Sequence, residues 1–296
     1  MLNHPALNYL NNTFPVGVRY MLLSAAGFAL MAVCVKQVST YGIPVLEIIA
    51  ARAIISLLIS YVDVKRKNLS VWGNNKPLLI ARGFVGAFAL ICVYYAVITL
   101  PLAEATLIQY LHPAFTAIIA LIFLKEKVHL STLLCIVLSI IGLSVLVLPD
   151  LAQTKHTELP SFSVIVAVSG ALGSAVAYVM VRKLSQSEDS SVIIFYFPLI
   201  ALPVSILFPG ESFVLPNLES AGLLVLVGLF TQIGQVGLTK ALQTDTASKA
   251  TAYSYVQVIF AVILGWIFFA ETPAIWFWMG GSMIMAGALI NALYKH

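Results

Sequence analysis

Residues 99–127 read TLPLAEATLIQYLHPAFTAIIALIFLKEK, and this stretch decides the fold class of the chain. Between Pro101 and Leu124 the only charged side chain is that of Glu104, and the apolar residues do not alternate with polar ones. A helix needs about 20 such residues to cross the hydrocarbon core of a bilayer. The stretch therefore predicts a membrane-spanning helix over residues 101–124.

The composition of the whole chain favours a lipid environment. Of its 296 residues, 60% are hydrophobic and only 9% are charged, and the mean hydropathy is +0.99. Soluble domains carry roughly 25% charged residues on average. In lipid every backbone polar group needs a partner within the protein, so only helices or closed barrels span the membrane. Because a barrel would show alternating segments of about ten residues, the chain is predicted to be an all-α integral membrane protein.

Apolar runs of roughly 18–24 residues predict ten transmembrane helices. They lie near residues 18–37, 43–62, 78–99, 101–124, 130–148, 161–181, 191–208, 220–240, 246–269 and 275–293. Prolines stand at or just outside many of the ends, where a missing N–H costs little. The seventh run is the least regular, because Pro198 and Pro203 interrupt it.

The opening stretch has a counterpart 145 residues later, where residues 244–272 read TDTASKATAYSYVQVIFAVILGWIFFAET. Tyr110 then matches Tyr255, and Glu126 matches Glu271. The chain therefore divides into two five-helix repeats, at residues 18–148 and 161–293. Since five is an odd number, the two repeats must face opposite ways across the membrane. Inverted repeats are typical of secondary transporters, whose substrate sites lie at the repeat interface near the midplane.

Basic residues predict the orientation, because cytoplasmic loops carry an excess of Lys and Arg. If the N-terminus is cytoplasmic, that side holds Arg19, Lys65, Arg66, Lys67, Lys76, Arg82, Lys125, Lys127, Arg182, Lys183, Lys240, Lys249 and Lys295. The other side then holds only Lys36 and Lys155. Both termini are therefore predicted to be cytoplasmic. The net charge of +4 lies in short connections and forms no basic aromatic patch, so nucleic acid is not an expected partner.

A set of short motifs resembles a known family. In the first half these are Arg82-Gly83, Tyr94-Tyr95-Ala96, Leu100-Pro101-Leu102-Ala103-Glu104-Ala105-Thr106, Pro113-Ala114-Phe115-Thr116, Leu124, Glu126 and Gly142. In the second half they are Thr239-Lys240-Ala241-Leu242, Ala247, Ala250, Tyr255 and Glu271. The pattern, over residues 18–293, resembles the drug/metabolite transporter superfamily in its ten-helix branch of paired EamA repeats. The resemblance implies two inverted five-helix bundles around a central cavity.

The halves differ at one position of this motif, where the second half has Val258 in place of Pro113. Proline removes the hydrogen bond to the carbonyl of the residue four positions earlier, here Gln109. We therefore expect a proline-opened turn in the fourth helix only.

Polar side chains in the fourth and ninth runs are candidates for a substrate site, since polar groups inside a membrane usually face the bundle interior. Gln109, His112 and Thr116 share one helical face. The repeat places Ser254 and Gln257 at the positions of Gln109 and His112. Interhelical hydrogen bonds that merely hold the bundle together are the alternative interpretation.

Further candidates lie in the third, fourth, eighth and ninth runs. Tyr110 and Tyr255 form a repeat-related aromatic pair that could line or gate a cavity, and Gln235 belongs to a polar stripe with Gln232 and Thr239. Tyr94 and Tyr95 lie nearer the outer end of their run, where an interfacial aromatic belt is an equally good interpretation.

Charged and titratable residues within the runs are candidates for binding or coupling. Arg52 lies near the midplane of the second run, where it is costly unless paired, so it either binds substrate or forms an ion pair with another helix. Glu47 is the only carboxylate expected well inside a run. His112 and Glu47 are the coupling candidates, since a histidine titrates near cytoplasmic pH. Glu104, Glu126 and Glu271 are expected to be structural.

Enzymatic activity is not expected, because no GxSxG, HExxH, Walker or GxGxxG motif appears in a suitable context. Cys34, Cys92 and Cys135 lie singly inside apolar runs and are expected to be buried hydrophobes, so no metal or cofactor is predicted.

The predicted function is secondary transport of a small polar metabolite, most plausibly an amino acid or a derivative, by a monomer or homodimer in the bacterial inner membrane. Two alternatives stay open. One is a nucleotide, nucleotide-sugar or organic-anion exchanger with Arg52 and Lys36 as anion contacts, and the other is a non-transporting membrane receptor or assembly factor.

Overall fold

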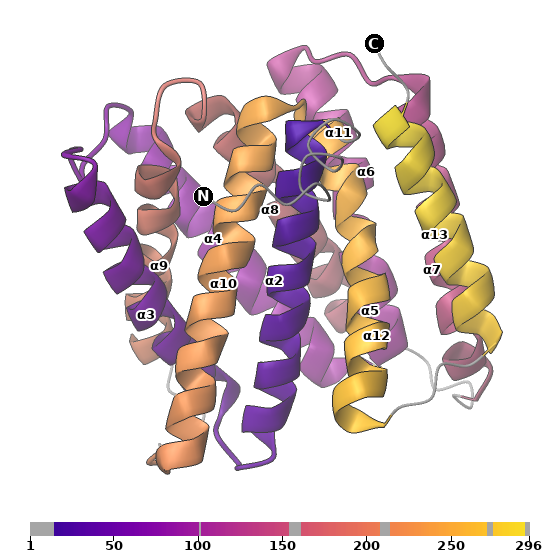
Figure 1. The fold of residues 1–296 in the computed structure, drawn as a ribbon, viewed down its shortest axis with the longest axis horizontal. Helices are drawn as coiled ribbons and strands as arrows, with labels where there is room; N and C mark the ends of the chain where they lie inside the picture. The colour runs from indigo at the N-terminus through magenta and orange to yellow at the C-terminus, as the bar shows by residue number, and fades with distance from the viewer. Residues whose placement is uncertain (1–14, 101, 154–160, 208–213, 271–274, 294–296) are drawn as a thin grey trace, which may run out of the picture.

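The structure is a computed structural model, and it describes residues 15–100, 102–153, 161–207, 214–270 and 275–293 (Figure 1). Within these ranges the secondary structure is helical and contains no strand. The first half comprises α2 (Val16–Ser39), α3 (Val45–Arg66), α4 (Lys76–Thr99), α5 (Leu102–Gln109), α6 (His112–Ile119), the π-turn η1 (Ala120–Leu124) and α7 (Leu130–Gln153). The second half comprises α8 (Ser161–Leu184), α9 (Ser190–Leu207), α10 (Leu218–Thr244), α11 (Ala247–Ala252), the 3₁₀ turn η2 (Tyr253–Tyr255), α12 (Val256–Phe269) and α13 (Ile275–Leu293).

Seven helical segments of the described chain are long and apolar enough to cross a membrane. They are α2, α3, α4, α8, α9, α10 and the continuous segment Ala247–Phe269. Three shorter apolar segments lie at His112–Leu124, Leu130–Val145 and Trp278–Leu293. The seven long and three short segments fall at the ten predicted spans. The prediction of an all-helical, multi-pass membrane protein is confirmed.

Prolines disturb these helices less than the sequence suggests. Pro44 directly precedes α3 and Pro77 lies in the first turn of α4, where no helical N–H is required. Pro198 and Pro203 lie inside α9, yet α9 continues from Ser190 to Leu207. The seventh crossing is therefore one helix, although two prolines lie within it.

The helix boundaries recur at the offset of 145 residues seen in the sequence. Val16–Ser39 of α2 corresponds to Ser161–Leu184 of α8, and α5 and α11 begin at Leu102 and Ala247. The packing recurs as well: α2 contacts α10 and α12, while α8 contacts α4 and α6. α3 pairs with α9, and α7 pairs with α13. Figure 1 shows that α2 begins and α13 ends at the same end of the bundle.

Small residues allow the closest of these contacts, between α2 and α10. A Cβ atom on Gly27 would lie 2.8 Å from the Gly234 nitrogen, and one on Gly237 would lie 2.6 Å from the Tyr20 carbonyl oxygen. The Ser24 hydroxyl donates a hydrogen bond of 2.8 Å to the Gly234 carbonyl. Between membrane helices such close backbone packing takes the place of the hydrophobic effect.

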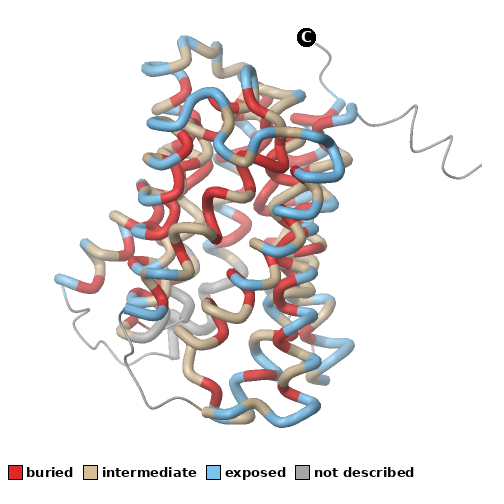
Figure 2. Tube along the Cα trace, turned by 90° about the vertical axis from the view of Figure 1, so that its left-hand side faces the viewer, coloured by how far each residue is buried: buried red, intermediate tan, exposed pale blue. Residues whose placement is uncertain are grey.

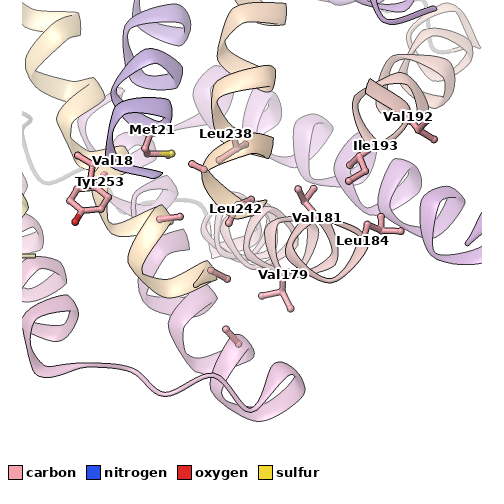
Figure 3. Close-up of a cluster of buried hydrophobic side chains, with 14 of the residues drawn as sticks. Val18, Met21, Val179, Val181, Leu184, Val192, Ile193, Leu238, Leu242 and Tyr253 are labelled. Carbon is pink, nitrogen blue, oxygen red and sulfur yellow. The ribbon is translucent and has the colours of Figure 1, made fainter. Parts of the chain in front are cut away.

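Burial follows the pattern of a protein solvated by lipid. Buried segments face the middle of the bundle, and the exposed surface includes large apolar side chains such as Phe123, Leu58 and Trp266 (Figure 2). The largest core cluster lies where α2, α8, α9, α10 and η2 meet and includes Met21, Val181, Leu238, Leu242 and Tyr253 (Figure 3). This cluster joins helices of the two halves.

Ionic links also join the two halves at the end of the bundle where α3 ends and α9 begins. The Lys67 ammonium lies 2.9 Å from the Asp189 carboxylate and 3.1 Å from that of Asp63. Partial burial opposes ionisation of Asp189, but hydrogen bonds from Ser191 and Lys67 outweigh it and hold the pKa of Asp189 below its usual value. The link is therefore charged at neutral pH.

Candidate transport site

The fourth crossing is interrupted near the middle of the bundle. α5 ends at Gln109, a turn occupies Tyr110–Leu111, and α6 begins at His112. Pro113 in the first turn of α6 has no N–H to continue the helical pattern. The opened turn predicted from Pro113 is therefore present.

The ninth crossing is a continuous helical segment that also leaves the regular α-helical pattern, but it has no proline-opened turn, as expected. α11 ends at Ala252, Tyr253–Tyr255 form a 3₁₀ turn, and α12 begins at Val256. The second half has Val258 where the first has Pro113, so proline is not the cause here. A tighter i→i+3 turn changes the direction of the backbone without requiring proline.

The two interruptions meet through the predicted tyrosine pair. The rings of Tyr110 and Tyr255 stack with centroids 5.7 Å apart and an interplanar angle of 27°. The Tyr255 hydroxyl also donates a hydrogen bond of 2.8 Å to the Tyr110 carbonyl oxygen. Backbone that leaves the helical pattern inside a membrane has to be satisfied by the protein or by a water-lined cavity. Tyr255 supplies such a partner to the interruption in the opposite half.

His112 lies beside this pair and is buried, with only 5% of its surface exposed. Its ring contacts Tyr178 of α8 edge to face at 5.2 Å and lies 6.1 Å from the ring of Tyr110. The Nδ1 atom is buried without a hydrogen-bond partner. Gln109 is half-buried, and its amide nitrogen lies 3.5 Å from the Ser174 hydroxyl. The structure thus brings His112 and Tyr110 together, with an aromatic wall from α8.

The second half contributes less polar contact to this region. Ser254 is buried and its hydroxyl has no hydrogen-bond partner, while Gln235 and Gln257 are half-buried. Gln232, in contrast, accepts from Ser56 at 2.5 Å and donates to Ser60 at 3.0 Å. Gln232 therefore joins α10 to α3. This contact fits the alternative interpretation, in which polar side chains form interhelical hydrogen bonds that hold the bundle together.

The remaining tyrosine candidates lie on α4. Tyr94 is half-buried, and Tyr95 is exposed on the outside of α4, with its ring 5.9 Å from that of Phe162. Tyr95 therefore packs against another aromatic ring on the surface, and it has no described contact with Tyr110 or Tyr255.

Two arginines are buried within the described helices. Arg52 of α3 is 7% exposed and Arg82 of α4 is 5% exposed, and both guanidinium groups lie over the ring of Phe197 in α9. Arg82 lies about 9 Å along α4 from the helix start, and its side chain is buried. Its position as the seventh residue of α4, directly after five apolar residues, is the signal that the sequence analysis missed.

Glu47 lies in the first turn of α3 rather than well inside a span, which corrects its expected position. Its carboxylate accepts a hydrogen bond of 3.1 Å from the Val214 backbone nitrogen. Lys36 lies over the ring of Phe269 at 4.4 Å. Neither residue has a described contact with His112 or Arg52.

The contacts of Glu126 agree with the structural role expected for it. Its carboxylate accepts from Arg182 at 2.7 Å and from the Ala247 nitrogen at 2.8 Å, tying the end of the fourth crossing to the start of the ninth. The Glu104 side chain and Glu271 lie outside what the structure describes.

A hollow of about 550 Å³ lies between α4 and α9, away from the tyrosine pair. It is lined by Trp72, Lys76, Ile80, Phe84, Tyr196, Leu199 and Ile200. None of these residues is among the predicted site residues, and the lining is almost wholly apolar. We therefore centre the candidate site on the interrupted helices.

Metal ligation has no candidate cluster in the described ranges, where no group of three His, Cys, Asp or Glu side chains converges. Cys34, Cys92 and Cys135 are free and buried, as expected for small apolar residues.

Comparison with known proteins agrees with the arrangement of the helices. The profile of the EamA-like transporter family matches twice, at residues 15–148 and 161–293. A crystal structure aligns with a TM-score of 0.82 at 18% identity, covering 93% of this chain and 96% of that one, which shows a shared fold.

Two relatives match nearly the whole chain. The pseudopaline exporter CntI of Pseudomonas aeruginosa is 29% identical over 276 residues, covering 92% of this chain and 94% of CntI. Human solute carrier family 35 member G1 is 32% identical over 296 residues, covering 95% of this chain and 79% of that protein. With both halves matched, the chain belongs to the EamA-like transporter family.

Proposed function

We propose that this protein is a secondary transporter of a small polar metabolite, of the amino-acid or amino-acid-derivative class. The observation that carries the proposal is the meeting of two interrupted helices at Tyr110 and Tyr255, beside His112. Broken helices facing each other across a repeat interface are a recurring way to build a substrate site near the membrane midplane. Family membership supports transport rather than catalysis.

The proposed mechanism is alternating access between two inverted repeats, residues 18–148 and 161–293. The matched boundaries and matched helix pairs support this symmetry. Rocking of one half against the other would open the site alternately to the two sides. Tyr110 and Tyr255 would gate or line the cavity, and Gln109, Ser254 and Gln257 would offer hydrogen bonds to the substrate.

We further propose that the basic end of the bundle faces the cytoplasm, in a bacterial inner membrane. Lys67 follows the end of α3, Lys127 lies between η1 and α7, and Lys183 lies in the last turn of α8; the excess of basic residues at such positions favours this orientation. A reporter fused after Lys127 should report the cytoplasm, and a periplasmic signal would reverse the assignment.

Export is the favoured direction, because a relative covered over most of its length is named as an exporter. An organic-anion exchanger is the second candidate, and the two buried arginines favour it.

Counterflow in proteoliposomes tests the transport function. Purified protein is reconstituted, and exchange of labelled glutamine, glutarate, glycerol 3-phosphate and putrescine is measured against protein-free vesicles. We expect at least one of the four compounds to exchange well above the rate in protein-free vesicles. If none of the four exchanges faster than in empty vesicles, the proposal is contradicted.

A His112→Gln variant tests the role of the buried histidine. Glutamine keeps a polar side chain of similar size but cannot titrate, and the described groups facing His112 are the aromatic rings of Tyr110 and Tyr178. If His112 carries a coupling proton, the variant should exchange substrate normally and lose its response to an imposed pH gradient. An unchanged response would leave His112 as a wall of the cavity only.

A further inference from the structure

Arg52 and Arg82 approach the same aromatic ring from two different helices. The Arg82 guanidinium carbon lies 4.9 Å from the centroid of the Phe197 ring, and that of Arg52 lies 5.9 Å from the same centroid. The two cationic groups can therefore be no more than about 11 Å apart. α3 and α4 both pack against α9, which carries Phe197. The arrangement concentrates two positive charges on one side of the bundle interior.

Neither arginine has a carboxylate partner in the part of the chain that the structure describes. The Nε and Nη1 atoms of Arg82 are buried with no hydrogen bond, and the Met31 sulfur at 3.9 Å is the contact of Arg52. Glu47, five residues before Arg52 on α3, accepts a hydrogen bond from the Val214 nitrogen and forms no described ion pair with Arg52.

The contacts with Phe197 do not compensate for burying these charges. A cation–π contact contributes roughly 0.5–2 kcal/mol. Removing an unpaired charge from water costs several kcal/mol, even after the protein relaxes. In membrane proteins such charges usually face a water-filled cavity or the path of a substrate. Two of them on one ring indicate that a negative charge is bound there during the working cycle.

The backbone beside Arg82 leaves room for its guanidinium group. Gly86 lies one helical turn after Arg82, and a Cβ atom at Gly86 would lie 2.6 Å from the Arg82 Nη1 and 3.0 Å from the Phe197 ring. Any larger residue at this position would displace the guanidinium. Tyr178 lies close enough to interact electrostatically with Arg82, and its ring contacts His112. Arg82 is thus connected through Tyr178 to His112 at the start of α6.

We propose that Arg52 and Arg82 form the anion-binding part of the transport site, so that the transported metabolite is a small organic anion bearing a carboxylate or a phosphate. This inference rests on the proposed transport function and favours the second of its two candidate substrate classes, the organic anions. Arg82, with its planar fork of donors, binds the anionic group. Arg52 supplies the second charge, and Phe197 holds both guanidinium groups in place. The tyrosine pair and His112 then contact the remainder of the substrate.

Thermal unfolding of the purified protein tests the site with defined probes. Glutarate, glycerol 3-phosphate, glutamine and putrescine are added separately at millimolar concentration. A ligand that binds only the folded state raises the apparent Tm. We expect glutarate or glycerol 3-phosphate to raise it by a few degrees, with no effect of putrescine. The two anions distinguish a carboxylate site from a phosphate site.

Three variants locate the effect. Arg82→Gln and Arg52→Gln should each weaken anion binding about 10- to 100-fold, as expected for losing a charge-assisted hydrogen bond. Lys183→Gln removes a positive charge from an exposed position at the basic end and should bind as the wild type does. In the absence of ligand, Arg82→Gln should unfold at the wild-type temperature or above it, because a buried unpaired charge is removed.

The outcomes separate this inference from the function on which it rests. Exchange or binding of glutamine alone, unaffected by the arginine variants, would overturn the anion site and leave transport standing. A clear fall in the ligand-free Tm of Arg82→Gln would also overturn it, by showing that the arginine is structural. Absence of exchange for all four probes would count against the transport function itself.

Discussion

The fourth and ninth crossings are built alike but interrupted by different means. Both contain a tyrosine at the interruption, Tyr110 in one and Tyr255 in the other, 145 residues apart. The fourth crossing has Pro113 after a two-residue turn, whereas the ninth has a 3₁₀ turn and no proline within it. The difference teaches that proline favours the interruption but is not required for it. In the ninth, the Tyr255 hydroxyl at the turn donates a hydrogen bond to the Tyr110 carbonyl of the other half.

The crossings also end alike. The residue after each last turn is left-handed, Lys125 and Ala270, each with φ of 55°. Their backbone N–H groups donate to the carbonyls five positions earlier, Ala120 and Gly265. The fourth crossing has in addition the carboxylate of Glu126, which reaches both Arg182 and the first residue of the ninth crossing.

Of the changes considered, breaking the ion pair between Glu126 and Arg182 should have the largest effect on the stability of the protein. Arg182 and Glu126 are 18% and 12% exposed, and Arg182 also donates to the Leu242 and Gln243 carbonyls at 2.9 and 3.2 Å. Arg182→Met would leave the Glu126 carboxylate without its cation. We expect a loss of about 3 kcal/mol, since removing one partner of a buried pair strands the other. Thermal unfolding in detergent measures the loss.

The double variant Arg182→Met with Glu126→Gln serves as the control. A neutral amide can still accept from the Ala247 nitrogen, so the double variant should recover part of the stability lost by the single one. If the double variant is as unstable as the sum of the single variants, the two side chains do not act as a pair.

Removing the hydroxyl of Tyr255 should have an intermediate effect. Tyr255→Phe keeps the ring stacked on Tyr110 but deletes the bond to the Tyr110 carbonyl. We expect a loss of about 1 kcal/mol, the usual contribution of such bonds. The melting temperature should fall and counterflow should slow. A variant with unchanged stability and transport would show that this bond does not hold the two interruptions together.

Much of the fold could be predicted because lipid imposes a simple rule on the sequence. Long apolar runs reveal crossings, and a fixed offset of 145 residues revealed the Tyr110–Tyr255 pair, since repeated sequence packs in repeated positions. The interruption at Tyr253–Tyr255 could not be predicted, because no glycine or proline marks it. A 3₁₀ turn there depends on tertiary contacts.

The site residues were less predictable because the direction of a side chain depends on neighbouring helices. Tyr94 and Tyr95 are adjacent in sequence, yet a rotation of about 100° per residue turns Tyr95 outward against Phe162. Arg82 was counted among the basic residues of the cytoplasmic side, and its burial could not be predicted from this count. That no described carboxylate pairs with it is visible only after folding.

The smallest expected effect comes from the left-handed residues that end the two crossings. A non-glycine residue in this conformation is strained by about 1–2 kcal/mol, and glycine removes the strain at some entropic cost. Ala270→Gly and Lys125→Gly should therefore each stabilise the protein by about 0.5–1 kcal/mol, and a similar gain at both positions would extend the equivalence of the two crossings. Gly42→Ala is the matched reverse change, because Gly42 has φ of 73° and a Cβ there would meet no atom within 4 Å. It should destabilise through strain alone, by a similar amount. If Ala270→Gly lowered the melting temperature while Gly42→Ala also lowered it, contacts of the Ala270 methyl group would outweigh backbone strain, and the equivalence would not extend to the helix ends.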